Sequence, residues 1–246
     1  MLARAFIGAL TFAISANAGV VYHFSTKFVG GRFEVKQSGK VWVEGNSYRF
    51  EIDPDASKSQ RPFDVAISTD ADTTAKFLNT NKQTWWDRQR VGTMTRSSML
   101  FDLPMAGGKV GRRRVQLNEN GTETIAGHEA KKHVIDIDYQ IEARIDGSPL
   151  RGNVKATAII WTAESLPRLP LQRPLKTGFD EVDRDLAQAS AKIKGMVLRH
   201  ELTVTRTLAG GPPVTETVTT IVDDVDVMNV DPSRFEVPSG FRYEAP

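Results

Sequence analysis

Residues 135–145 read IDIDYQIEARI, and apolar and polar side chains alternate along them without a break. Successive side chains of a β-strand point to opposite faces, so this stretch predicts a strand with one dry face and one wet face. Such strands are typical of antiparallel sheets that cover a core on one side only. The apolar members of the predicted dry face are Ile135, Ile137, Tyr139, Ile141, Ala143 and Ile145.

The same alternation recurs along most of the chain. Further strands are predicted at residues 20–29, 32–44, 47–53, 64–69, 75–79, 83–88, 153–161, 198–208 and 214–222. Turn residues separate them, among them Gly30-Gly31 and Asp146-Gly147-Ser148. Strands do not alternate with helices in the repeating way that indicates a parallel sheet. We therefore expect one β-rich domain over residues 19–246.

One amphipathic helix is predicted between residues 179 and 197. Apolar residues recur there at steps of three or four, at Phe179, Val182, Leu186, Ala189, Ile193 and Val197. Thr177 followed by Asp180 resembles a capping box, and acidic residues crowd the start of the segment. A weaker helix is predicted over residues 95–103. Because an apolar stripe must cover an apolar surface, we expect an α+β fold in which these helices pack on the dry face of the sheet.

The first 18 residues predict a secretory signal peptide. Arg4 supplies a positive charge, residues 5–14 form a short apolar run, and Ala16-Asn17-Ala18 fits cleavage after Ala18. The run is much shorter than the roughly 20 residues that span a membrane. The alternative is a buried N-terminal helix. With the signal removed, the mature chain is expected to begin at Gly19 and to be soluble, with no transmembrane segment.

Charge and cysteine content exclude several functions. The 246 residues carry a formal charge of +2, which argues against a dedicated nucleic-acid-binding protein. The tight basic run Arg112-Arg113-Arg114 is interpreted as a solvated loop in preference to a phosphate site. The chain has no cysteine, so it has no disulfide, no thiol nucleophile and no lipid-modified cysteine after the signal.

Motifs that would carry chemistry are weak. The segment His128-Glu129-Ala130-Lys131-Lys132-His133 is one residue longer than the zinc motif H-E-x-x-H, and histidines five apart diverge on a helix and face opposite ways on a strand. The chain contains no G-x-S-x-G elbow and no phosphate-binding glycine loop. Loop carboxylates such as Asp53 and Asp70 are interpreted as solvated, because they lack EF-hand spacing. We therefore predict no catalytic residue, metal site or cofactor.

Trp85-Trp86 is the most informative aromatic pair. Adjacent residues of a strand face opposite ways, so one indole can enter the core while the other meets solvent or a ligand. An indole combines a large apolar surface with a polar N–H, which suits the wall of a ligand site. The alternative is one core tryptophan and one tryptophan at the rim of the sheet.

Four short segments resemble a family of secreted bacterial proteins of unknown function. They are residues 124–133 (TIAGHEAKKH), 160–167 (IWTAESLP), 235–241 (FEVPSGF) and the early hairpin at 39–51. That family is similar to the LolA/LolB-like lipoprotein carriers. The resemblance implies a strongly curved antiparallel sheet, a half-barrel, with one or two helices covering its concave apolar face. It also implies a periplasmic location and the binding of an acyl chain or a lipid-modified partner, and it supplies no catalytic residues. The proline-rich stretch 166–178 departs from the family and is either a lid hinge or an insertion.

Three functions remain open at this point. The leading hypothesis is a non-enzymatic periplasmic protein that binds a lipid, an acyl chain or a lipoprotein in the half-barrel. The second is an interaction or scaffold module of the cell envelope that binds another protein through its sheet edges or the Trp85-Trp86 region. The third is a hydrolase whose polar residues would face into the concavity. For the leading hypothesis the predicted ligand-binding residues are Ile135, Ile137, Tyr139 and Ile141 as the floor, Phe179, Val182 and Leu186 as the lid, and Trp85 and Trp86.

Overall fold

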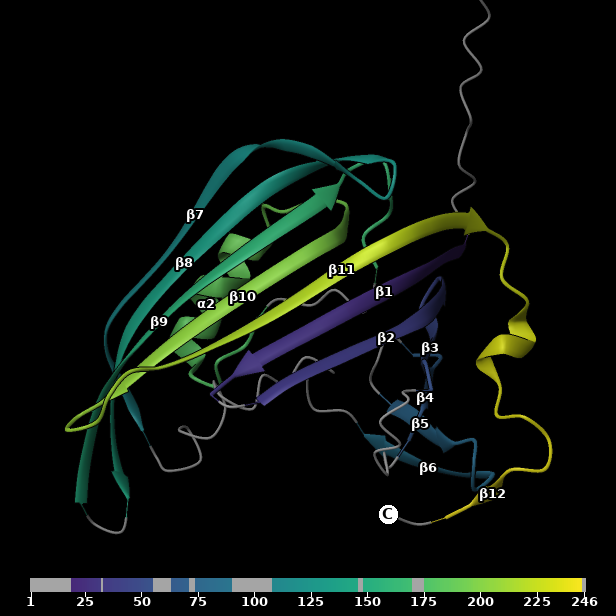
Figure 1. The fold of residues 1–246 in the computed structure, drawn as a ribbon, viewed down its shortest axis with the longest axis horizontal. Helices are drawn as coiled ribbons and strands as arrows, with labels where there is room; N and C mark the ends of the chain where they lie inside the picture. Colours follow the sequence, from purple (N-terminus) through teal and green to yellow (C-terminus); the bar gives the residue numbers. More distant parts are fainter. Residues whose placement is uncertain are drawn as a thin grey trace, which may run out of the picture.

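A computed structural model describes residues 19–31, 33–54, 63–70, 74–89, 108–145, 148–169 and 175–244. These residues form one 12-stranded sheet in the order β12-β6-β5-β4-β3-β2-β1-β11-β10-β9-β8-β7 (Figure 1). Every neighbouring pair is antiparallel except β12 and β6, which are parallel. The predicted signal peptide and the predicted helix at 95–103 lie outside the described residues.

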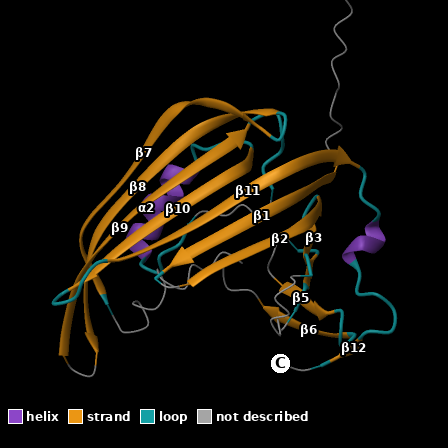
Figure 2. Ribbon diagram, viewed as in Figure 1, coloured by secondary structure: helices purple, strands orange, loops and turns teal. Residues whose placement is uncertain are grey.

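Long strands make up most of the sheet, and shorter strands make up one end of it (Figure 2). The strands are β1 (Gly19–Gly30), β2 (Phe33–Glu44), β3 (Ser47–Ile52), β4 (Val65–Ser68), β5 (Thr74–Asn79), β6 (Thr84–Gln89), β7 (Lys109–Ile125), β8 (His128–Ile145), β9 (Ser148–Ala163), β10 (Met196–Leu208), β11 (Val214–Met228) and β12 (Arg242–Tyr243). The helices within the described residues are α2 (Asp180–Ser190) and the 3-10 turn η2 (Pro232–Phe235).

The predicted fold class is confirmed. The sheet is open and curved, and α2 packs on its concave face behind β8, β9 and β10 in the view of Figure 1. Each strand predicted from alternation is present, and most extend beyond their predicted ends. None of the helices in the described ranges is both long enough and apolar enough to cross a membrane.

Strand β7 was not predicted, and the interpretation of Arg112-Arg113-Arg114 as a loop is wrong. These three residues are exposed on β7, which is the outermost strand at one edge of the sheet. Two irregularities in its register with β8, at Val110/Arg113 and at Glu119/Thr122, interrupt the alternation that would have indicated a strand. The triple arginine stays solvated because the edge position leaves it exposed.

The predicted helix is shorter than its apolar stripe. Helix α2 ends at Ser190, and Val197 already belongs to β10. Between them Gly195 adopts a φ of +80° and lies so close to the end of β9 that a Cβ would be 2.2 Å from the carbonyl oxygen of Ala163. The chain therefore leaves the helix at a sharp turn that only glycine fits.

The predicted capping box at Thr177 and Asp180 is also wrong. The residue before the helix is Phe179, and no side chain caps it. Instead the carboxylate of Asp183 accepts hydrogen bonds from the Thr177 hydroxyl (2.8 Å) and from the backbone N–H of Gly178 (3.2 Å). Asp183 lies three residues after Asp180, the expected capping residue. Its hydrogen bonds hold the chain that leads into α2 against the first turn of the helix, and this contact sets where α2 meets the sheet.

The convex face has its own smaller core at one end of the sheet. The C-terminal segment that contains η2 places Val230 and Phe235 against Val21, Ile67 and Leu78. The turn itself is capped by Asp231, whose side chain accepts a hydrogen bond from the backbone N–H of Ser233 at 2.9 Å. The C-terminal segment thus packs on the convex face, whereas α2 packs on the concave face and covers only part of it.

Candidate ligand-binding surface

The register of the strands aligns apolar residues into rows that cross the concave face. One row consists of Val35, Phe28, Val218, Leu202, Ala158, Ile135 and Leu117, taken from β2 through to β7. The next row consists of Phe33, Gly30, Glu216, Val204, Ala156, Ile137 and Val115. Each row begins on β2, where Val35 and Phe33 are exposed, and ends beneath α2. The first row is apolar throughout, whereas Glu216 interrupts the second.

One end of these rows is exposed. At this end, on β2, Phe33 is 75% exposed and Val35 is 54% exposed. Beside the rows on the same concave face, Val214 of β11 is 44% exposed and Leu208 of β10 is 38% exposed. Phe28 and Val218 lie between them and are half-buried. We call these six residues the open apolar surface. Large apolar side chains gathered on one concave face, in contact with a core, are typical of a binding surface.

The predicted floor and lid come together at the other end of the rows. Ile135, Ile137, Tyr139 and Ile141 of β8 form one buried cluster with Phe179, Val182 and Leu186 at α2. The rings of Tyr139 and Phe179 meet edge to face with their centroids 5.9 Å apart. Each of the seven residues is 5% exposed or less. Floor and lid therefore contact each other directly, and a ligand between them would have to displace α2.

The two predicted tryptophans face opposite sides of β6. Trp86 lies on the concave side, where its ring stacks on Phe77 with centroids 5.8 Å apart. Trp85 lies on the convex side and meets Tyr243 of β12 edge to face at 4.9 Å. Neither belongs to the cluster that contains the floor and the lid. Of the two, only Trp86 shares a face with the open apolar surface.

Two charged side chains interrupt the rows at the boundary between the open apolar surface and the covered core. Arg206 of β10 and Glu216 of β11 form an ion pair, with the guanidinium Nη2 3.2 Å from the carboxylate Oε2. Their side chains are 24% and 12% exposed. Sequence reasoning missed this pair, because the two residues are ten apart in the chain and meet only through the β10–β11 register.

His200 lies on the same face, aligned with Thr220 of β11 and Ile160 of β9. Burial lowers the pKa of its imidazole to about 4, against the ordinary 6.5, and the nearby Glu201 opposes this shift. In the described part of the chain its Nε2 has no hydrogen-bond partner. The ring is therefore neutral at pH 7. Burial likewise raises the pKa of Tyr139, so this phenol also stays uncharged.

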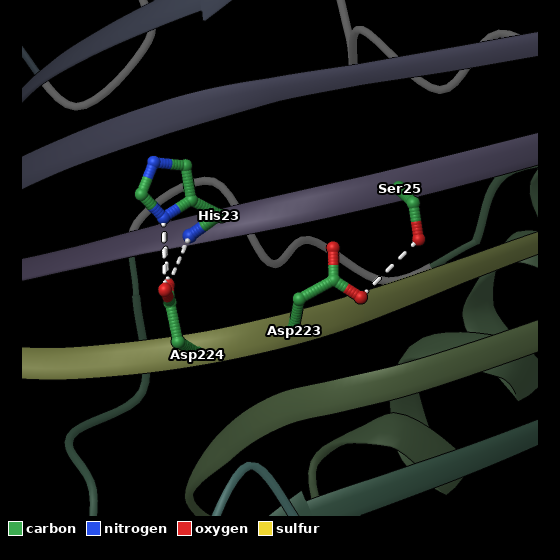
Figure 3. Close-up of polar contacts among 4 residues, drawn as sticks. All are labelled: His23, Ser25, Asp223 and Asp224. Carbon is green, nitrogen blue, oxygen red and sulfur yellow. Dashed lines mark hydrogen bonds and ion pairs between the residues drawn. The ribbon is translucent and has the colours of Figure 1, made fainter.

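A polar group on the convex face invites comparison with a catalytic triad (Figure 3). The His23 Nδ1 lies 2.8 Å from an Asp224 oxygen, and the hydroxyl of Ser25 donates to Asp223 at 3.4 Å. A shift in the β1–β11 register skips Asp223, which allows consecutive aspartates to face β1 together. Hydrogen bonds from His23 lower the pKa of Asp224. Within this group the serine and the histidine bind different aspartates, so no imidazole activates the hydroxyl as a nucleophile.

A pocket of about 530 Å³ adjoins this group, and its lining includes Ser25, Lys27, Lys36, Ser38, Asp53 and Ile221. Ser25 and Lys27 alternate along β1 with Phe24 and Phe28, whose side chains lie on the concave face. The pocket therefore opens on the convex side, away from the open apolar surface. Both lysines already pair with Glu34, at 3.1 and 3.3 Å. The charges of this pocket are thus satisfied within the chain.

Among the described residues, no three His, Cys, Asp or Glu side chains lie close enough together to hold a metal ion. His128 and His133 both lie on β8, five residues apart, and so face opposite ways. His128 contacts the Ser165 hydroxyl at 3.4 Å, and the buried His133 contacts the Thr162 hydroxyl at 3.1 Å.

No family model matches the sequence, and no curated protein matches it. Among solved structures, the chain is similar to PNGF-II, with 10% identity over 92% of this chain and a TM-score of 0.34, and it spans 31% of that chain's length. It is also similar to a LolA superfamily protein from Nitrosomonas europaea, with 8% identity, a TM-score of 0.34 and coverage of 90% of this chain and 91% of that one. A DUF1329 family protein from Desulfovibrio piger gives 8% identity and a TM-score of 0.31 over 91% of each chain.

The solved structures to which the chain is similar thus include a member of the LolA superfamily, the group that the four sequence segments resemble. Identities of 8 to 10% and TM-scores of 0.31 to 0.34 transfer no ligand, partner or activity to this chain. The function has to be argued from the concave face itself.

Proposed function

We propose that the concave face binds an apolar ligand, the acyl chain of a lipid or of a lipid-modified protein, and that the protein is a non-enzymatic periplasmic binding protein or carrier. The observation that supports this proposal is the open apolar surface, with Phe33 75% and Val35 54% exposed at the start of rows that continue into the core. Burying a lipid chain contributes about 0.8 kcal/mol for each methylene group, so a short track of such residues would hold an acyl tail.

The predicted floor and lid form the inner wall of this proposed site. An acyl chain that lies along Val35, Phe28 and Val218 reaches Leu202, which already contacts the cluster beneath α2. A longer chain would continue between floor and lid only if α2 moved away from β8. Trp86 lies on the same face and would extend the wall at the far end of the sheet, whereas Trp85 would support it from the convex side.

The other two hypotheses have weaker support. A scaffold that adds a partner strand at the β7 edge is disfavoured, because β7 carries exposed Arg112, Arg113 and Arg114 and two register irregularities, features that oppose strand addition. A hydrolase would need an activated nucleophile. The convex group around His23 does not provide one, and on the concave face the Nε2 of His200 contacts no hydroxyl among the described residues. The periplasmic location rests on the predicted signal peptide.

The test is uptake of an acyl probe, measured with cis-parinaric acid by fluorescence and its displacement by dodecanol. Val35→Gln places an amide on the open apolar surface, and we expect binding to weaken by about tenfold, because burying a valine side chain contributes about 1.5 kcal/mol or more. Val29→Gln is the matched control, since Val29 is 39% exposed on the convex face of the adjacent strand. Failure of the unaltered protein to take up the probe, or equal losses in both variants, would refute the proposal.

A further inference from the structure

The Arg206–Glu216 ion pair lies where the open apolar surface meets the core under α2. Glu216 stands between Gly30 of β1 and Val204 of β10, and Arg206 stands between Val214 of β11 and Val154 of β9. Val204 and Val154 are 2% and 1% exposed, whereas Val214 is 44% exposed. The residues on the core side of the pair are therefore apolar and buried, whereas its other side is accessible from the open apolar surface.

The apolar residues Phe28 and Phe33 lie next to these two charges, so the apolar tail of a ligand on this surface would lie beside them. At Gly30 a Cβ would lie 2.7 Å from the ring of Phe28 and 3.0 Å from the Cγ of Glu216. Glycine thus leaves room for the aromatic ring and the acidic side chain to approach each other. Phe33 continues the apolar surface on the other side of Gly30 in the same row. A ligand whose tail follows Phe28 and Phe33 would have its head beside Arg206 and Glu216.

The charge of the pair limits which head it can accept. Two largely desolvated charges in an apolar setting are costly unless each has a counter-charge, and here they neutralise each other. A head with a single charge can bind only one member of the pair, and it has to break the Arg206–Glu216 contact to do so. A head with one negative and one positive group can bind both, and the four charges then alternate in sign. Arg presents several N–H donors in a planar fork that suits phosphate oxygens.

We propose that this pair is a headgroup site for a zwitterionic amphiphile, an inference that rests on the proposed function. The ligand's phosphate would lie at the Arg206 guanidinium and its ammonium at the Glu216 carboxylate. The class of ligand is then a single- or double-chain lipid whose head combines a phosphate and an ammonium group.

Four probes, each with twelve carbons in its chain, test this inference below their micelle concentrations: dodecylphosphocholine, dodecanoate, dodecyltrimethylammonium and dodecanol. Calorimetric titration of the full chain should give the tightest binding for dodecylphosphocholine, by about tenfold over dodecanol, as expected for hydrogen bonds and ion pairs to charged groups. The double variant Arg206→Gln with Glu216→Gln keeps the net charge and should remove this preference while dodecanol still binds. Lys131 and Glu164 form an exposed ion pair at 2.9 Å in the unaltered protein. The control double variant Lys131→Gln with Glu164→Gln should keep the preference for dodecylphosphocholine.

The single variants make the test independent of the double variant's stability. Arg206→Gln removes the positive partner of Glu216 and should shift the preference toward dodecyltrimethylammonium. Glu216→Gln removes the negative charge opposite Arg206 and should shift the preference toward dodecanoate. Equal binding of all four probes by the unaltered protein, or a preference for a singly charged head, would overturn the headgroup site and leave the proposed function standing. Binding of none of the four would overturn the proposed function itself.

Discussion

Protonation of His200 should destabilise the folded chain as the pH falls. Burial lowers the pKa of this imidazole to about 4 in the folded state, whereas in the unfolded chain it returns to the ordinary 6.5. Between these two values the unfolded state binds a proton that the folded state does not, so the free energy of unfolding decreases with falling pH. The contribution is fully present above the unfolded pKa and is lost as the pH falls to the folded one.

The size of the effect follows from the two pKa values. Their separation corresponds to about 3 kcal/mol, at 1.36 kcal/mol for each pH unit, and about 2 kcal/mol of this is lost by about pH 5. Carboxylates titrate over part of the same range, so the informative quantity is the difference between the unaltered protein and a variant without the imidazole.

Urea denaturation at about pH 7.5 and about pH 5 measures this difference. His200→Gln and His200→Phe both remove the titrating ring, and each should lose about 2 kcal/mol less than the unaltered protein between these pH values. The two variants differ in one useful respect, because phenylalanine also removes the buried Nε2 that lacks a partner among the described residues. A pH dependence that is the same in all three proteins would refute the reasoning, whatever the absolute stabilities are.

Three further changes test the packing of α2 and the edge of the sheet. Leu186→Ala removes a side chain that is 0% exposed beneath the helix, and it should cost about 2–5 kcal/mol of unfolding free energy in urea titrations. Gly195→Ala places a Cβ 2.2 Å from the carbonyl oxygen of Ala163 at a φ of +80°, so its thermal midpoint should fall by more than that of Gly210→Ala, where the φ is similar and the space is open. Arg113→Gln removes a half-exposed ion pair of β7 with α2 and should change stability by less than about 1 kcal/mol, with the difference shrinking in high salt.

The strands themselves were predictable because their signal is local. Along β8, the side chains of Ile135, Ile137, Tyr139 and Ile141 alternate with polar ones, and all four are buried. The stripe of α2 was visible for the same reason, and Phe179, Val182 and Leu186 do meet the floor that the alternation indicated. Strand β7 escaped because two register irregularities break its period, and the end of α2 was misplaced because Gly195 acts through contact with a distant strand.

What lies on the concave face depends on register, which no local pattern contains. The sequence by itself determined that the chain would build antiparallel strands with one apolar face and a helix to cover it, since side-chain period and amphipathicity are properties of neighbouring residues. Only the tertiary structure decided that α2 covers β8 to β10 and leaves Phe33 and Val35 exposed, and that Arg206 meets Glu216 at the boundary. The order of twelve strands and the offset of each against the next set those positions, because a shift of one residue in any pair would turn its side chains to the other face.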